Sequence, residues 1–318
     1  MPATINRLGL EVLRRWRATG REPSAFAGIA HRALSEAIGP LIRSPAQWVR
    51  RIADLPTLPK QNLASKFGEP PVTLFARAGI AIDIYFWTHP ATAIHDHLFC
   101  GAFGVLHGVS LHRTWQFDCP APLDDGVRVG QLRPLASELL FVGDVRPIAA
   151  APHLIHQVAH LAKPSVSVCV RTTADAPPPN QCVYFAPGLV AVLPKLLPAH
   201  SQRQLAMLAM LADAGHPETL AVAIELVDHA DDALAFWLLW GLAQHGDMGL
   251  VLQALTDCRQ RPWFDAVLPA QFELGQQVPP DLATGHGDGD DLGRLQRWLA
   301  GVPEAPALLH QYAERTPR

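Results

Sequence analysis

Apolar and polar positions follow three different rhythms along the 318-residue chain, and each rhythm predicts a different kind of element. In residues 1–65 apolar side chains recur every three or four positions, as at Leu8, Val12 and Trp16, which predicts helices. A further helix is expected to begin after Ser44, because serine caps helix N-termini and Pro45 suits a first helical position. Residues 1–65 are therefore predicted to form an N-terminal helical segment.

Residues 66–178 have a different pattern. Short runs rich in β-branched and aromatic residues alternate with Gly, Pro and Asp, which predicts strands joined by turns. These runs are "PVTLFARAGIAIDIYFW", "GVLHGVSLHRTWQF", "SELLFVGDV" and "PSVSVCVRT". Many short strands at this spacing are typical of an antiparallel barrel or sandwich. The segment "TADAPPPNQ" then interrupts the pattern and is predicted to be a linker.

The remaining residues, 179–318, return to a helical rhythm. Two stretches, "LADAGHPETLAVAIEL" and "LAQHGDMGLVLQAL", resemble one helix-loop-helix unit used twice, which would give stacked helical hairpins. An ordinary helical bundle explains the same pattern equally well. The expected fold class is α+β, with a β-barrel between N-terminal helices and an all-helical C-terminal domain.

The composition restricts the functions that such a chain can have. Hydrophobic residues make up 49% of it and charged residues 17%, as in globular proteins. A net charge of -3 provides no basic surface, so nucleic acid is not an expected partner. The run "ALAFWLLWGLA" is too short to span a bilayer, and the N-terminus lacks the features of a signal peptide. Five cysteines without a CxxC pair favour free thiols, so a cytoplasmic location is predicted.

Histidines are concentrated in the strand-rich region. Eight of the fifteen lie between His89 and His160, in less than a quarter of the chain. His95 and His97 flank Asp96 shortly after the strand-like run "IAIDIYFW". Alternate residues of a strand share a face, so both imidazoles can bind one metal ion.

The stretch "HDHLFCGAFGVLHG" resembles the first motif of the cupin family, an H-x-H followed by a glutamate and later by a glycine. His95 and His97 match the two histidines, Gly101 occupies the glutamate position, and Gly108 matches the final glycine. The stretch "PHLIHQV" resembles the second cupin motif, with His156 at the ligand position.

Within this second motif Pro152 matches, and His153 stands where the family has a glycine. His153 could compete with His156 as a ligand, but the register set by Pro152 favours His156. The longer stretch "PHLIHQVAHLAKPSVSVCVRTTADAPPP" resembles the cysteine dioxygenase branch of the cupins. The resemblance covers about residues 70–180, a little over a third of the chain.

This resemblance implies a jelly-roll barrel that holds one Fe(II), or another divalent metal, through His95, His97 and His156. Three ligands on one face of the metal leave the opposite face for a substrate and dioxygen. Because Gly101 supplies no carboxylate, the metal keeps its full positive charge, which favours an anionic ligand such as a thiolate. The implied function is a thiol dioxygenase-like incorporation of O2 into a small metal-ligated substrate.

Several positions depart from the family pattern. Cys169 stands where the family has a histidine near the metal, and it is either a buried small hydrophobe or a new functional group. Arg171 stands at the position of the tyrosine that is crosslinked in the animal enzymes, so no crosslink is expected. His160 replaces an asparagine and lies either near the metal or at the barrel rim. His112 is expected on a solvent-facing strand position.

For substrate binding the family uses an arginine, early in the barrel, that clamps a carboxylate bidentately. Arg77 is the best positional match, although a surface position at a strand end explains it equally well. Arg171 can supply the charge instead.

Two other functions stay open at this point. The same histidines can hold Mn, Ni or Zn for a lyase or isomerase reaction, which would consume no oxygen. Alternatively, the helical repeats carry a binding or scaffolding function beside a vestigial barrel, which predicts no stoichiometric metal. The helical region either shapes the active site or forms a homodimer.

Overall fold

The computed structural model describes residues 2–63, 67–118, 126–151, 153–173, 181–244, 261, 263 and 291–316. The chain divides into two compact units that do not follow its linear order. The first unit comprises Met1–Thr114, Leu135–Pro179 and Pro280–Arg318, and the second comprises Trp115–Pro134 and Asn180–Pro279. Pro152 of the second motif and most of the second predicted helix-loop-helix copy lie outside the described residues.

The N-terminal segment is helical, as predicted. It contains α1 (Pro2–Ala18), α2 (Pro23–Ala37) and α3 (Pro45–Ala53), with a short 3-10 helix η1 (Gly39–Leu41) before α3. The predicted start of α3 is confirmed. The Ser44 side chain accepts a hydrogen bond from the Gln47 backbone N–H, and the Gln47 side chain accepts one from the Ser44 N–H. This reciprocal pair satisfies two donors that a helix N-terminus otherwise leaves unpaired.

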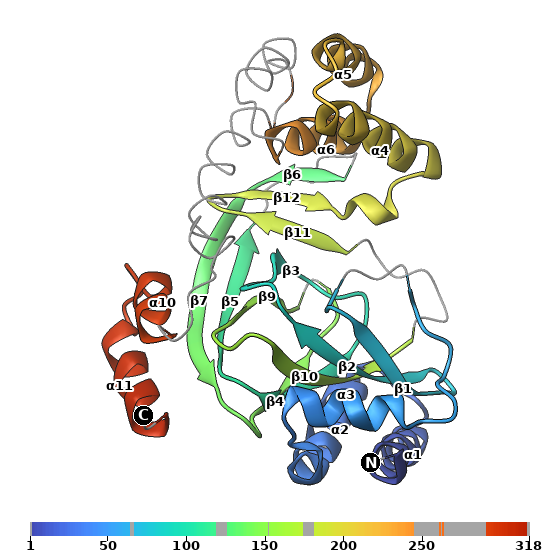
Figure 1. The fold of residues 1–318 in the computed structure, drawn as a ribbon, viewed down its shortest axis with the longest axis vertical. Helices are drawn as coiled ribbons and strands as arrows, with labels where there is room; N and C mark the ends of the chain where they lie inside the picture. The colour runs from blue at the N-terminus through green and yellow to red at the C-terminus, as the bar shows by residue number, and fades with distance from the viewer. Residues whose placement is uncertain are drawn as a thin grey trace. The chain divides into compact units, whose positions relative to one another are not determined.

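A five-stranded antiparallel sheet lies against α1 and α2 (Figure 1). Its strand order is β1 (Pro71–Arg77), β2 (Ile80–Trp87), β10 (Ser165–Thr172), β4 (Gly101–His107) and β8 (Val145–Ile148). Both faces of its central strands are buried. On β2 the alternate residues Ile82, Ile84 and Phe86 join the core formed with the helices, whereas Tyr85 belongs to a separate apolar cluster that includes Cys169 of β10. This double burial explains why these strands are almost continuously apolar.

Four strands of the other sheet also contribute to this unit, in the order β3 (Ile94–His95), β9 (Ile155–His160), β5 (Ser110–Asp118) and β7 (Gln131–Leu140). From β2 onward the strand order is that of a jelly roll. One sheet contains β2, β10, β4 and β8, and the other contains β3, β9, β5 and β7. The boundary between the units falls within β5 and β7. Two C-terminal helices, α10 (Asp291–Trp298) and α11 (Ala305–Arg315), complete this unit.

The second unit contains three strands, β6 (Val127–Val129), β12 (Leu189–Val192) and β11 (Cys182–Phe185), paired in that order. A 3-10 helix η2 (Pro194–Leu196) leads to the helices α4 (Ala199–Asp213), α5 (Thr219–His229) and α6 (Asp232–Gln244). The region after residue 179 was predicted to be all-helical, but it opens with two strands, β11 and β12, before its helices begin. In the part of the chain that the structure describes, every helix is too short or too polar to cross a membrane. The predicted α+β jelly roll with helical regions at both ends is confirmed.

Candidate metal centre

Three histidines, two on neighbouring strands and one in the segment just after β3, converge at one end of the barrel interior. His95 on β3 pairs directly with His156 on β9, and His97 follows two residues after His95. Each is only 3% exposed, and one potential ligand atom of each lies within 4.8 Å of the others. Nε2 of His97 lies 2.8 Å from Nε2 of His156. Two nitrogens this close to each other can both bind the same cation.

Hydrogen bonds on the far side of two rings set which nitrogen of each faces the cluster. Nδ1 of His95 donates to the carbonyl oxygen of Ala93 at 2.8 Å, so Nε2 is the nitrogen that carries the lone pair when the ring is neutral. His156 is held through a longer chain. Its Nδ1 lies 2.9 Å from Nε2 of His112, whose Nδ1 lies 2.9 Å from Oε1 of Glu138.

The direction of this chain follows from its carboxylate end. Burial raises the pKa of Glu138, but the hydrogen bonds from His112 and Arg146 outweigh it and lower that pKa to about 2. The ionised carboxylate can only accept, so His112 donates to it from Nδ1. A neutral His112 then accepts on Nε2 from the Nδ1–H of His156. His156 is then left with its lone pair on Nε2, directed at the cluster. Oriented imidazoles of this kind are typical of metal ligands.

Burial also keeps the ligand candidates in the form that binds metals. It lowers the pKa of His97 and of His156 well below the ordinary value, and the neighbouring imidazoles lower both further. Both side chains are therefore neutral near pH 7, and only a neutral imidazole offers a lone pair to a cation.

Gly101, at the position where the first cupin motif has glutamate, has no room for a side chain. A Cβ atom there would overlap the carbonyl oxygen of Val170 on β10. A ligand side chain at this position would therefore require the two strands to move apart. Among the residues that the structure describes, the candidate ligands of this site are thus the three histidines alone.

We expect a Gly101→Ala substitution to lower the free energy of unfolding by about 1–3 kcal/mol, because the added methyl group strains two paired strands. Urea denaturation measures this change. The matched control is Gly39→Ala in η1, where an added Cβ has no neighbour within 4 Å among the described residues. Equal midpoints for the two variants would contradict the close approach at Gly101.

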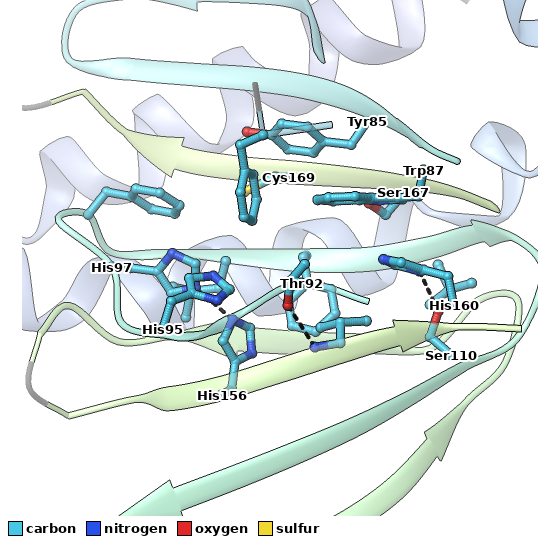
Figure 2. Close-up of a pocket in the computed structure, with 16 residues that line it drawn as sticks. Tyr85, Trp87, Thr92, His95, His97, Ser110, His156, His160, Ser167 and Cys169 are labelled. Carbon is cyan, nitrogen blue, oxygen red and sulfur yellow. Dashed lines mark hydrogen bonds between the residues drawn. The ribbon is translucent and has the colours of Figure 1, made fainter. Parts of the chain in front are cut away.

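A mainly apolar cavity lies beside the three histidines (Figure 2). Its wall contains five aromatic side chains, those of Phe67, Tyr85, Trp87, Phe99 and Phe103. The polar groups in the wall come from histidine, serine, threonine, tyrosine and tryptophan, and no Asp, Glu, Lys or Arg lines it in the described parts of the chain. The space that the centre of a water-sized sphere can occupy is about 40 Å³, which is room for about three water molecules. A cavity of this size suits a small ligand.

Comparison with known proteins adds little to this geometry. No family model and no curated protein matches the chain. Several solved structures resemble about a third of it. A hydroquinone 1,2-dioxygenase, PnpCD, in complex with Cd2+ and 4-hydroxybenzonitrile, is 15% identical, with 35% of this chain and 68% of that chain covered and a TM-score of 0.27.

Two further structures belong to the cupin or double-stranded β-helix type. A cupin-2 domain containing protein from Shewanella frigidimarina is 9% identical, with 40% of this chain and 92% of that chain covered and a TM-score of 0.25. A double-stranded β-helix protein from Klebsiella pneumoniae is 16% identical, with coverages of 36% and 79% and a TM-score of 0.24. The three converging histidines, and not these similarities, indicate a metal site.

His112 and Glu138 are the residues of the candidate site that the sequence did not reveal. His112 was expected to face solvent, but it is buried, because β5 lies between β9 and β7 and this face of it points into the barrel. Glu138 reaches it from β7, 26 residues away. The one local signal was the position of His112 two residues after Ser110, another inward-facing residue of β5.

The two candidate arginines do not reach the cavity. Arg77 is exposed near the end of β1 and is absent from the cavity wall, so the structure does not bring it to a bound substrate. Arg171 lies behind Phe99, and its Nε donates to Oδ2 of Asp83 at 2.6 Å. Since Asp83 is buried, this ion pair already neutralises the charge of Arg171.

The remaining candidates are placed differently from one another. Cys169 lines the cavity within an apolar cluster, and burial, together with the charge of Asp83, raises the pKa of its thiol. The thiol is therefore neutral, and it is unsuited to metal binding as a thiolate. His153 is exposed, outside the cavity wall. His160 lines the cavity, where its ring stacks on that of Trp87 with centroids 4.8 Å apart.

Burial of His160 predicts a specific pH dependence of stability. It lowers the pKa of this side chain from 6.5 to about 3. Below the ordinary pKa the unfolded chain takes up a proton that the folded protein does not, so acidification favours unfolding. The free energy of unfolding should therefore fall less steeply with decreasing pH in His160→Phe than in the wild type. Between about pH 6 and pH 4 the two slopes are expected to differ by up to about 1.4 kcal/mol per pH unit.

Urea denaturation at a series of pH values measures this slope. His153→Phe is the matched control, because it makes the same change of side chain at an exposed position outside the cavity wall. Identical slopes for the wild type and His160→Phe would show that His160 is protonated in the folded protein.

Proposed function

We propose that this protein is a non-haem Fe(II)-dependent oxygenase that oxidises a small substrate, a thiol in the first instance, bound directly to the metal. The observation that carries the proposal is the convergence of three buried histidines, His95, His97 and His156, on one end of a mainly apolar cavity. A bound Fe(II) would supply the redox chemistry of dioxygen and an attachment point for the substrate.

The charge balance of the site favours an anionic ligating atom. Burial keeps His97 and His156 neutral, an imidazole binds a metal only as the neutral ring, and Gly101 leaves no room for a carboxylate. A divalent cation held there keeps its full charge inside an apolar surrounding, so an anion bound to it is strongly stabilised. A thiolate has both the charge and the affinity for such a metal.

The protein's own residues have distinct roles in this proposal. Ala93 and the His112–Glu138 pair hold the rings of His95 and His156 with Nε2 turned inward. The aromatic wall limits the access of bulk water, which reduces side reactions and strengthens electrostatic interactions inside. The neutral Cys169 thiol leaves the ligating position to the substrate.

The test is metal content and oxygen uptake of the full chain loaded anaerobically with Fe(II), with 2-mercaptoethanol as a first probe thiol. We expect about one iron per chain after removal of excess metal, and oxygen consumption that requires both iron and thiol. Iron binding without oxygen uptake for any of a panel of thiols would overturn the oxygenase proposal and favour non-oxidative metal chemistry. A folded chain that retains no metal would overturn the site itself.

A further inference from the structure

The cavity has a second polar end that the metal site does not use. Nδ1 of His160 lies 3.1 Å from Oγ of Ser110 and 3.0 Å from Oγ of Ser165. The other ring nitrogen, Nε2, is buried and has no hydrogen-bond partner among the described residues. A buried polar atom without a partner costs free energy, so it is a natural binding point for a ligand.

This nitrogen belongs to the cavity and not to a separate part of the core. His160 is 3% exposed and lines the same cavity as the three histidines. In Figure 2 its ring lies beneath that of Trp87, on the side of the cavity opposite to His97. Stacking on Trp87 and two serine hydroxyls fix the ring, so the position of Nε2 is preorganised.

The wall between these two ends carries no formal charge among the described residues. A charged group of a substrate would lose its hydration there without gaining an ion pair, which is strongly unfavourable. Of the two candidate arginines, Arg171 is already paired with the buried Asp83. Arg77 is exposed on β1. The cavity therefore lacks the carboxylate clamp that a free amino acid would need.

We propose that the substrate is a small thiol with no charged group besides the sulfur that binds the metal, and that its hydroxyl or other neutral polar group hydrogen-bonds to Nε2 of His160. This inference rests on the proposed function and defines the substrate class of that site. A hydroxyl suits the site in either tautomer of His160, because it can donate or accept. The apolar wall contacts the carbon chain between the two polar ends.

Four thiols with the same two-carbon spacer test this proposal. They are 2-mercaptoethanol, 1-propanethiol, 3-mercaptopropionate and cysteamine, which differ in carrying a hydroxyl, a methyl, an anionic and a cationic group. Each is titrated into the full chain loaded with Co(II), and the absorption band of thiolate bound to Co(II) reports binding. Dissociation constants are corrected for the ionised fraction of each thiol.

In the wild type we expect both charged thiols to bind at least about tenfold more weakly than 2-mercaptoethanol. Tightest binding of 3-mercaptopropionate or cysteamine would overturn the proposal. This comparison needs no variant, so it holds even if a substitution in the cavity prevents folding.

The hydrogen bond to His160 is tested by measuring the binding of 2-mercaptoethanol and of 1-propanethiol to both the wild type and His160→Phe. The preference for 2-mercaptoethanol over 1-propanethiol is expected to fall about tenfold in His160→Phe, which removes one hydrogen bond. His153→Phe, the same substitution at an exposed histidine, should keep the wild-type preference. An unchanged preference in His160→Phe would overturn the role of His160.

This experiment distinguishes failure of the proposed function from failure of the proposed substrate class. Absence of Co(II) binding, or of the thiolate band with every thiol, overturns the proposed function and the substrate class with it. Thiolate binding that favours a charged thiol, or that ignores His160, overturns the substrate class alone and leaves the metal site intact.

Discussion

Replacing His97 with alanine is expected to abolish stoichiometric Fe(II) binding. Its Nε2 lies 2.8 Å from that of His156, so the two nitrogens would bind the same ion, and two remaining ligands hold a divalent cation poorly. The loss of affinity should exceed the 10- to 100-fold typical of residues that only support a ligand. Metal content after gel filtration, together with a competition titration against a chelator of known affinity, measures it.

The control for this experiment is His153→Ala. His153 is exposed and stands three residues before His156, where the sequence motif left it as a competing ligand. We expect this variant to bind metal as the wild type does. Loss of the metal in His153→Ala with retention in His97→Ala would require a different ligand set.

Replacing His112 with phenylalanine is expected to weaken metal binding by about 10- to 100-fold, although His112 is not itself a ligand candidate in this structure. The substitution removes the acceptor for the Nδ1–H of His156, so the ring is no longer held with Nε2 inward and its basicity falls. Glu138→Gln should have a smaller effect in the same direction, because the amide oxygen still accepts from His112 but the negative charge is lost. Co(II) affinity of the purified variants measures both effects.

His107→Phe provides the matched control for His112→Phe. His107 is half-buried near the end of β4 and is not part of the cavity wall, so the same change of side chain there should leave metal affinity within about twofold. Equal affinities for His112→Phe and the wild type would mean that the ring of His156 is oriented by strand pairing alone. A graded series, with the wild type above Glu138→Gln and Glu138→Gln above His112→Phe, would identify the hydrogen-bonded chain as the cause.

Local sequence determined the elements and the metal-ligand candidates of this protein. The capping pair at Ser44 and the β-branched runs of residues 71–172 act over a few residues, so their patterns predict a helix start and strands directly. The two-residue spacing of His95 and His97, and the motif around His156, likewise marked three residues that the fold brings together.

Only the tertiary structure decided what surrounds those histidines. In a jelly roll the inner strands are buried on both faces, so the alternation that normally separates core from solvent is lost, and the sequence could not tell that His112 points inward. The supporting contacts also join distant segments, since Glu138 meets His112 across 26 residues and Asp83 neutralises Arg171 across 88. Such pairs depend on which strands become neighbours in the sheets, and no local pattern records that choice.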